Sequence, residues 1–72
     1  MKSYIQFSII ADSGKTTTTQ VQNSQYGDPL GLIRWHSAWR RYAFFPANDC
    51  LFDVSCLTEI TEHIMKLMEA RR

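Results

Sequence analysis

The sequence predicts an α+β fold, in which a four-stranded antiparallel, meander-like sheet carries one C-terminal helix on one face. Three observations predict it. The first part of the chain alternates apolar and polar residues with the period of a strand, turn-forming residues divide that part at short intervals, and the last third repeats apolar residues with the period of a helix. At 72 residues the chain has room for one small domain, 1–72, in the element order β-β-β-β-α.

The first strand is expected over about residues 3–11, where Ile5, Phe7 and Ile9 alternate with polar residues and form its core face. A turn around Gly14 follows. The threonine-rich run at about 16–23 favours extended backbone but offers little to a core, so we expect the second strand at an edge of the sheet.

The third and fourth strands are expected over about 30–36 and 39–45, joined by the two residues Ser37-Ala38. In this register Arg34 lies directly opposite Arg41. The core face carries Ile33, Trp35, Tyr42, Phe44 and the aliphatic stem of Arg40. The second face carries Leu30, Leu32, Arg34, His36, Trp39, Arg41, Ala43 and Phe45. A one-residue change in the connection would exchange the faces of one strand.

The helix is expected over about residues 55–69, with Asp53 or Ser55 as its N-cap. The apolar residues that recur at helical spacing are Leu57, Ile60, Ile64, Leu67 and Met68. We expect this stripe to pack on the core face of the sheet, and the other helix positions, His63 among them, to meet solvent.

Charge is distributed unevenly although the chain as a whole carries +1. Residues 1–48 hold five Lys and Arg against two Asp, a net charge of +3, and residues 49–72 hold three against five, a net charge of −2. No acidic residue lies between Asp28 and Asp49, so a face built from the central arginines should be electropositive. A general nucleic-acid binder is not expected, because such domains usually have a pI above about 9.

The chain lacks the patterns that catalysis and cofactor binding require. It contains no Gly-rich phosphate loop, no G-x-S-x-G and no H-E-x-x-H. Cys50 and Cys56 lie six positions apart, which matches neither a zinc knuckle nor a redox pair, so we expect two buried free thiols. We therefore expect no catalytic residue, no metal and no cofactor.

Membrane insertion and export are not expected either. The uncharged, largely apolar run at residues 4–11 is shorter than the roughly 20 residues that a membrane-spanning helix needs. The first residues make a poor signal peptide, since a strand-like run containing Gln6 and Ser8 follows a single basic residue. We therefore expect a cytoplasmic protein.

The second face of the sheet is the expected binding surface, because one helix covers only one face. We expect a second copy of the chain to cover part of it, which makes the protein a homo-oligomer. The candidate ligand-binding residues are Arg34, His36, Trp39 and Arg41. Facing guanidiniums repel unless an anion lies between them, and guanidinium binds phosphate bidentately. An exposed indole stacks on a base and a histidine donates a hydrogen bond. Alternatively, the arginines extend into solvent or pair with carboxylates.

One long segment resembles a known group of proteins. Residues 30–46 read LGLIRWHSAWRRYAFFP and residues 56–60 read CLTEI. They resemble the pattern LG-x-I-x-W, x3, W-R-x-Y-x-F-x-P followed by C-L-x-x-I, found in small proteins of tailed phages and prophages. The matching positions are Trp35, Trp39, Arg40, Tyr42, Phe44 and Pro46. The resemblance carries no residue roles. It implies a phage context, in which very small proteins often counter host defence.

Three functions follow as hypotheses. The first is a phage counter-defence protein in the host cytoplasm that binds and sequesters an anionic nucleotide-like immune signal without catalysis. The second is a protein–protein inhibitor of the anti-CRISPR or anti-restriction type, which docks on a host defence protein through aromatic and arginine hot spots or through the threonine-rich edge. The third is a structural or DNA-associated phage component, whose affinity should fall steeply with salt.

Overall fold

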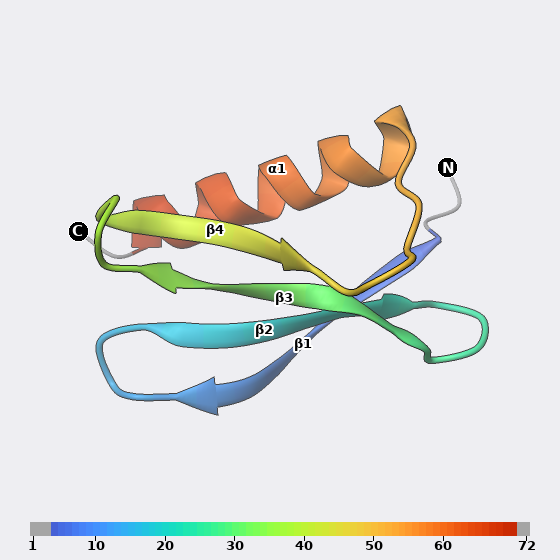
Figure 1. Cartoon of the computed structure of the whole chain (residues 1–72). Coiled ribbons are helices and arrows are strands. Elements are labelled where there is room, and N and C mark those ends of the chain that lie inside the picture. The colour runs from blue at the N-terminus through green and yellow to red at the C-terminus, as the bar shows by residue number, and fades with distance from the viewer. Residues whose placement is uncertain (1–3, 71–72) are drawn as a thin grey trace.

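A computed structural model describes residues 4–70 as one antiparallel sheet with a single helix against it (Figure 1). The elements are β1 (Ile5–Asp12), β2 (Thr17–Asn23), β3 (Pro29–His36), β4 (Arg41–Pro46) and α1 (Val54–Ala70). Each strand pairs with the next along the chain, in the order β1-β2-β3-β4. The predicted α+β meander with a C-terminal helix is therefore confirmed. Ser3, the expected start of the first strand, and the basic tail Arg71-Arg72 lie outside the described residues.

Local hydrogen bonds fix two of the boundaries. In the β1–β2 turn the Asp12 carboxylate accepts a hydrogen bond of 2.8 Å from the Gly14 amide, and Gly14 adopts a φ of 91°, a conformation that costs glycine little. Asp53 is the N-cap of α1, since its Oδ1 accepts a hydrogen bond of 2.9 Å from the Cys56 amide. This bond also holds the pKa of Asp53 below its ordinary value, because it stabilises the charged carboxylate.

Strand β2 lies inside the sheet, so the expectation that it forms an edge is wrong. It pairs with β1 on one side and β3 on the other, and Thr19 and Val21 are fully buried. Threonine is tolerated there because its β-branched methyl packs well in a strand. Within the described part of the chain the buried hydroxyls of Thr17 and Thr19 have no hydrogen-bond partner. The strands at the edges of the sheet are β1 and β4.

The hydrophobic core lies between α1 and the sheet face that was expected to meet it. Its buried residues are Ile5, Val21, Ile33, Tyr42 and Ile60. The half-buried residues packed around them are Phe7, Leu30, Trp35, Phe44, Phe52, Cys56, Ile64, Leu67 and Met68. Tyr42 joins several elements, since its ring meets Trp35 edge-on at 5.4 Å and its hydroxyl accepts a hydrogen bond of 3.1 Å from the Thr17 amide. The buried phenol is thereby satisfied.

The helix runs along β4 (Figure 1) and also reaches β1. There the His63 ring stacks on Phe7 with a centroid distance of 4.1 Å. His63 was expected in solvent, but it is half-buried, and this burial lowers its pKa. Ile9, further along β1, is 64% exposed, so its expected place in the core is wrong. The physical reason is that α1 covers the opposite edge of the sheet.

The apolar stripe of α1 begins at Cys56 instead of Leu57. Cys56 packs against the core, and burial raises the pKa of its thiol, whereas Leu57 is 47% exposed. Consecutive helix residues are rotated by about 100°, so when Cys56, Ile60 and Leu67 face the sheet, Leu57 lies about 60–100° further round, at the flank of the helix. Both cysteines are free, as expected, although they are half-buried and not fully buried.

Candidate functional site

The connection between β3 and β4 is longer than expected and changes their register. β3 ends at His36 and β4 begins at Arg41, because a hydrogen-bonded turn with Arg40 at a φ of 54° replaces the expected two-residue loop. Ser37-Ala38 lacks the Asn, Asp or Gly that a two-residue hairpin loop prefers. Trp39 and Arg40 therefore lie in the turn and not in the strand.

The register slides by two positions, so residues 32–36 and 41–45 keep their expected faces. Trp35 lies opposite Tyr42, and Arg34 lies opposite Ala43. The expected direct pairing of Arg34 with Arg41 is wrong: Arg41 lies opposite His36, which makes the two arginines diagonal neighbours. Diagonal side chains in an antiparallel pair are about 7–8 Å apart, so the expected repulsion is weaker.

The sheet face turned away from α1, called the open face below, has two halves of different chemistry. One row across it consists of Ser8, Gln20, Leu32 and Phe45, one residue from each strand. The β1 and β2 half is polar and uncharged, whereas the β3 and β4 half is aromatic and cationic. Leu30, expected on this face, packs against the core instead, next to the irregular register between β2 and β3.

The four predicted site residues come together with Phe45 in one group, called the arginine–aromatic cluster below: Arg34, His36, Trp39, Arg41 and Phe45. The Arg34 guanidinium lies 4.1 Å from the centroid of the Phe45 ring, a cation–π contact. The His36 ring meets Trp39 edge-on at 4.7 Å and faces Phe45 at 6.1 Å. Arg41 donates from Nε to the Trp39 carbonyl at 3.4 Å. Phe45 is the member that sequence reasoning placed on the face but not in the site.

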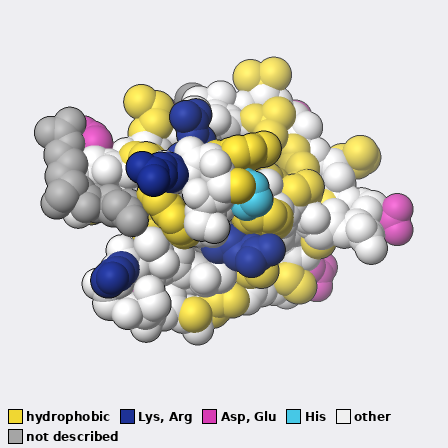
Figure 2. All heavy atoms as spheres, turned by 60° about the vertical axis from the view of Figure 1, so that its left-hand side comes forward, with side chains coloured by type: hydrophobic (Ala, Val, Ile, Leu, Met, Phe, Trp, Pro, Cys, Tyr) yellow, Lys and Arg dark blue, Asp and Glu magenta, His cyan; other side chains and the backbone are white. Residues whose placement is uncertain are grey.

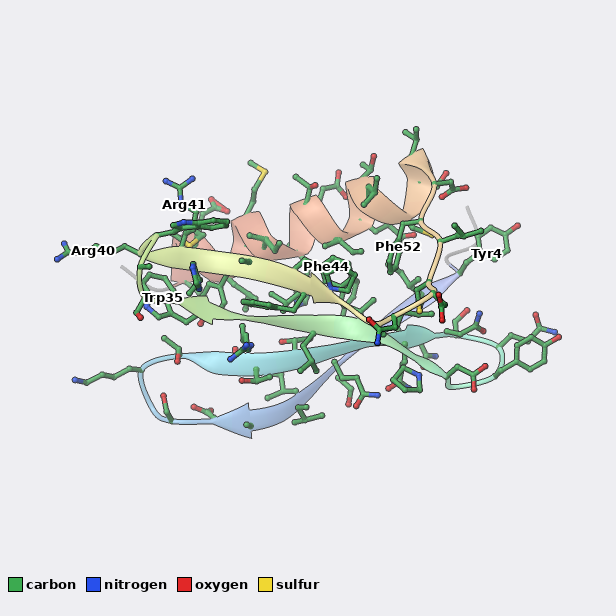
Figure 3. All side chains as sticks on the ribbon, viewed as in Figure 1. Tyr4, Trp35, Arg40, Arg41, Phe44 and Phe52 are labelled. Atoms are coloured by element: carbon green, nitrogen blue, oxygen red, sulfur yellow. The ribbon has the colours of Figure 1, made fainter. Side chains whose placement is uncertain are left out.

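The cluster is accessible and positively charged. Trp39 is 63% exposed, and Arg34 and Arg41 are also exposed. The contacts that the described residues give the two guanidiniums are an aromatic ring and a backbone carbonyl, neither of which neutralises the charge. Figure 2 shows Lys and Arg side chains gathered around a histidine and hydrophobic side chains on this end of the molecule. Arg40 instead points away from the sheet (Figure 3).

An apolar groove of about 420 Å³ adjoins the cluster. Its lining residues are Gln20, Pro29, Gly31, Leu32, Phe45, Pro46 and Ala47. Phe45 belongs to both the groove and the cluster, so the two form one continuous surface. At about 3.3 Å per strand residue, Leu32 in the groove lies about 13 Å from His36. The surface is thus elongated, apolar at one end and cationic and aromatic at the other.

Two other kinds of site find no support in residues 4–70. No group of three or more His, Cys, Asp or Glu side chains there could hold a metal ion. No helix in that range is long and apolar enough to span a membrane.

The fold and this face together define a small α+β protein with an accessible cationic and aromatic surface. The chain is 36% identical over 70 residues to an uncharacterized 9.3 kDa protein of Acholeplasma phage L2, and the match covers 96% of this chain and 90% of that protein. It therefore belongs to the same family of small phage proteins. No protein-family model matches the chain. No solved structure matches it either.

Proposed function

We propose that the protein binds an anionic, nucleotide-like ligand on the arginine–aromatic cluster and holds it without chemical change. In an infected cell it would sequester a host immune signal in the cytoplasm and so counter host defence. The observation that carries this proposal is that two exposed arginines of the open face and the exposed indole of the adjoining turn belong to one chain of contacts through Phe45 and His36. A nucleotide presents the complementary groups, a phosphate and a planar base.

Arg34 and Arg41 are the proposed phosphate ligands. The two residues are diagonal neighbours across β3 and β4, but the Arg34 guanidinium turns toward Phe45 and Arg41 Nε turns toward the Trp39 carbonyl, so each guanidinium is proposed to hold a separate phosphate of the ligand. Each guanidinium offers a planar fork of donors that matches phosphate oxygens. The Phe45 ring beneath Arg34 and the Trp39 carbonyl beside Arg41 hold the two forks in place before the ligand arrives.

Trp39 is the proposed stacking platform for a base. Its ring is exposed, while His36 supports it from the side. Stacking of a base on an aromatic side chain contributes about 1–3 kcal/mol. The groove beyond Phe45 can take a second planar or apolar part of the ligand, so the surface suits a dinucleotide better than a mononucleotide.

The surroundings of His36 support binding without catalysis. Its ring contacts among the described residues are with Trp39 and Phe45. General-base catalysis by histidine requires a nucleophile within reach and an orienting group on the second ring nitrogen. Aromatic neighbours provide neither, so His36 is proposed as a hydrogen-bond donor to the ligand.

Thermal-shift measurements with cyclic di-AMP and ADP-ribose test the proposal. A nucleotide that binds should raise Tm, and heat denaturation should return the compound unaltered, as chromatography would show. Binding should be lost in Arg34→Gln and Trp39→Ala and kept in the matched control Arg40→Gln, whose side chain points away from the face (Figure 3). An altered compound would show an enzyme, and equal losses in all three variants would contradict the assigned site.

A second candidate function is supported by the open edge of β1. The run from Tyr4 to Ala11 is uncharged, and Ile9 and Ile10 are exposed. Within residues 4–70, β1 has no neighbouring strand on its outer side. Unprotected edges pair with strands of other proteins. A host defence protein that docks there should be released by Ile9→Lys and retained by Arg34→Gln. The threonine-rich strand β2, which we expected to offer such an edge, has both sides paired.

A further inference from the structure

We propose that the helix α1 carries an interface of its own, separate from the ligand face, through which two copies of the chain pair as an antiparallel dimer. Its centre is an outer stripe of α1 that consists of Val54, Leu57, Thr61, Met65 and Met68. The exposed fractions are 80% for Val54, 61% for Met65 and 47% for Leu57. Of the residues expected to carry an oligomer interface on the open face, Trp39 is exposed, whereas Leu30, Leu32, Ala43 and Phe45 are already half-buried.

The outer stripe is distinct from the side of the helix that packs on the sheet. Its members are spaced by three, four, four and three residues, which keeps them on one side of an α-helix. Met68 borders the sheet, because its Sδ accepts a hydrogen bond of 3.4 Å from the Tyr42 amide in β4. The other members extend away from the core beside the β4 edge. The fold of one chain leaves Val54, Leu57 and Met65 largely uncovered.

The spacing makes this stripe complementary to itself. It is symmetric about Thr61, since Leu57 and Met65 lie four positions to either side and Val54 and Met68 lie seven. In an antiparallel pair related by a two-fold axis, Thr61 therefore faces Thr61, Leu57 faces Met65, and Val54 faces Met68. A small residue at the centre lets the helices approach, and the flexible methionines adapt to the branched side chains opposite.

Charge favours the same arrangement. The loop at the start of α1 carries Asp49 and Asp53, whereas the β3–β4 turn, which lies by the other end of the helix, carries Arg40 and Arg41 (Figures 1 and 3). With Lys66 and Glu69 of the helix counted as well, that end carries +2 among the described residues, from two arginines and one lysine less one glutamate. An antiparallel copy brings the basic end of one chain to the acidic end of the other. A parallel copy would place like charges together.

The size of the stripe predicts how tight the dimer is. A helix of 17 residues spans about 25 Å at 1.5 Å per residue. One helix side of this length buries less than the roughly 800 Å² per partner of a standard stable interface. We therefore expect a weak, reversible dimer in the micromolar range, and not an obligate one.

Sedimentation velocity and cysteine cross-linking test this interface. The chain should shift from monomer to dimer between micromolar and millimolar concentration, and Met65→Lys should keep it monomeric with an unchanged Tm because Met65 is exposed. In a Cys50→Ser background, Thr61→Cys should form a disulfide-linked dimer at least about tenfold faster than the control Lys66→Cys, which lies on another side of the helix.

Two results would overturn the interface. One is a chain that stays monomeric at every concentration, with equal cross-linking rates for Thr61→Cys and Lys66→Cys. The other is a dimer that survives Met65→Lys and is dissociated by Ile9→Lys, which would place the contact on the β1 edge. Nucleotide binding should be the same in the wild type and in Met65→Lys. A result that refutes the dimer therefore does not refute the proposed ligand site.

Discussion

Gly31 is the position where the packing of the sheet leaves least room, and Gly31→Ala is expected to destabilise the fold. A Cβ at this position would lie 2.6 Å from Phe44 Cε1 and 2.7 Å from the Phe45 carbonyl oxygen. Carbon atoms in ordinary contact lie about 3.5–4.0 Å apart, so the neighbours would have to retreat by about 1 Å. The Phe44 ring can turn aside, but the Phe45 carbonyl belongs to β4, which is paired with β3.

Overpacking of this kind costs about 1–3 kcal/mol. In a domain of this size each 1 kcal/mol lowers Tm by about 4–8 °C, so we expect Tm of Gly31→Ala to fall by about 4–20 °C. Circular dichroism during thermal and urea denaturation measures the change. The double variant Gly31→Ala/Phe44→Leu distinguishes the clash with the Phe44 ring from the clash with the Phe45 carbonyl. If the ring contributes to the clash, the loss of stability in the double variant should be smaller than the sum of the two single losses by at least about 0.5 kcal/mol. A Tm equal to or above that of the wild type would refute the close approach.

Three further predictions concern single side chains. Thr19→Val should raise the free energy of unfolding by about 1 kcal/mol, because it replaces a buried, unpaired hydroxyl with a methyl group. A lower free energy of unfolding, measured by urea denaturation, would show that the hydroxyl has a hydrogen-bond partner. Asp53→Ala should lower it by about 1 kcal/mol and Asp53→Asn by much less, since asparagine also caps; equal losses would argue against the cap. Burial lowers the pKa of His63 in the folded state, so the unfolded chain binds more protons at this residue. The contribution of His63 to the free energy of unfolding is therefore fully present above pH 6.5 and should decrease as the pH falls below that value. His63→Phe, which keeps the stack on Phe7, should flatten that dependence of Tm on pH, and an unchanged slope would assign the dependence to another group.

Much of the fold could be predicted because its signals are local. Alternation in β1, the turn at Gly14 and the capping carboxylate of Asp53 each depend on neighbours in sequence. The faces of β3 and β4 could be predicted although their register could not, since the error was two residues and the side-chain period of a strand is two. A turn one residue shorter or longer would have reversed the faces of one strand.

The remaining errors concern contacts between distant segments. The composition of β2 predicts a strand with little apolar surface, which favours an edge position. Its position between β1 and β3 is instead decided by strand pairing, which buries Thr19 although threonine adds little to a hydrophobic core. The placement of α1 along β4 is likewise a matter of tertiary packing. That placement exposes Ile9 and Leu57 and covers His63, and no periodicity along the chain encodes it.

The candidate site also has one part that local sequence predicts and another that depends on contacts between distant segments. The sequence pattern placed Arg34, His36 and Arg41 on one face, and the structure brings them together with Trp39. Phe45 was missed as a member, although its position in the same face as Arg34 was a usable signal. The groove beside it could not be predicted, because residues of three strands and the segment after β4 build it.

Nuclear magnetic resonance of the indole N–H groups tests the central claim most directly, because the two tryptophans occupy different environments. Trp39 is exposed in the arginine–aromatic cluster, whereas Trp35 packs in the core. In a titration with cyclic di-AMP and then ADP-ribose, we predict a saturable shift of the Trp39 signal, little change for Trp35, loss of the shift in Arg34→Gln and its retention in Arg40→Gln. A Trp39 signal that stays unchanged with every nucleotide, or that shifts equally in both arginine variants, would contradict the proposed site.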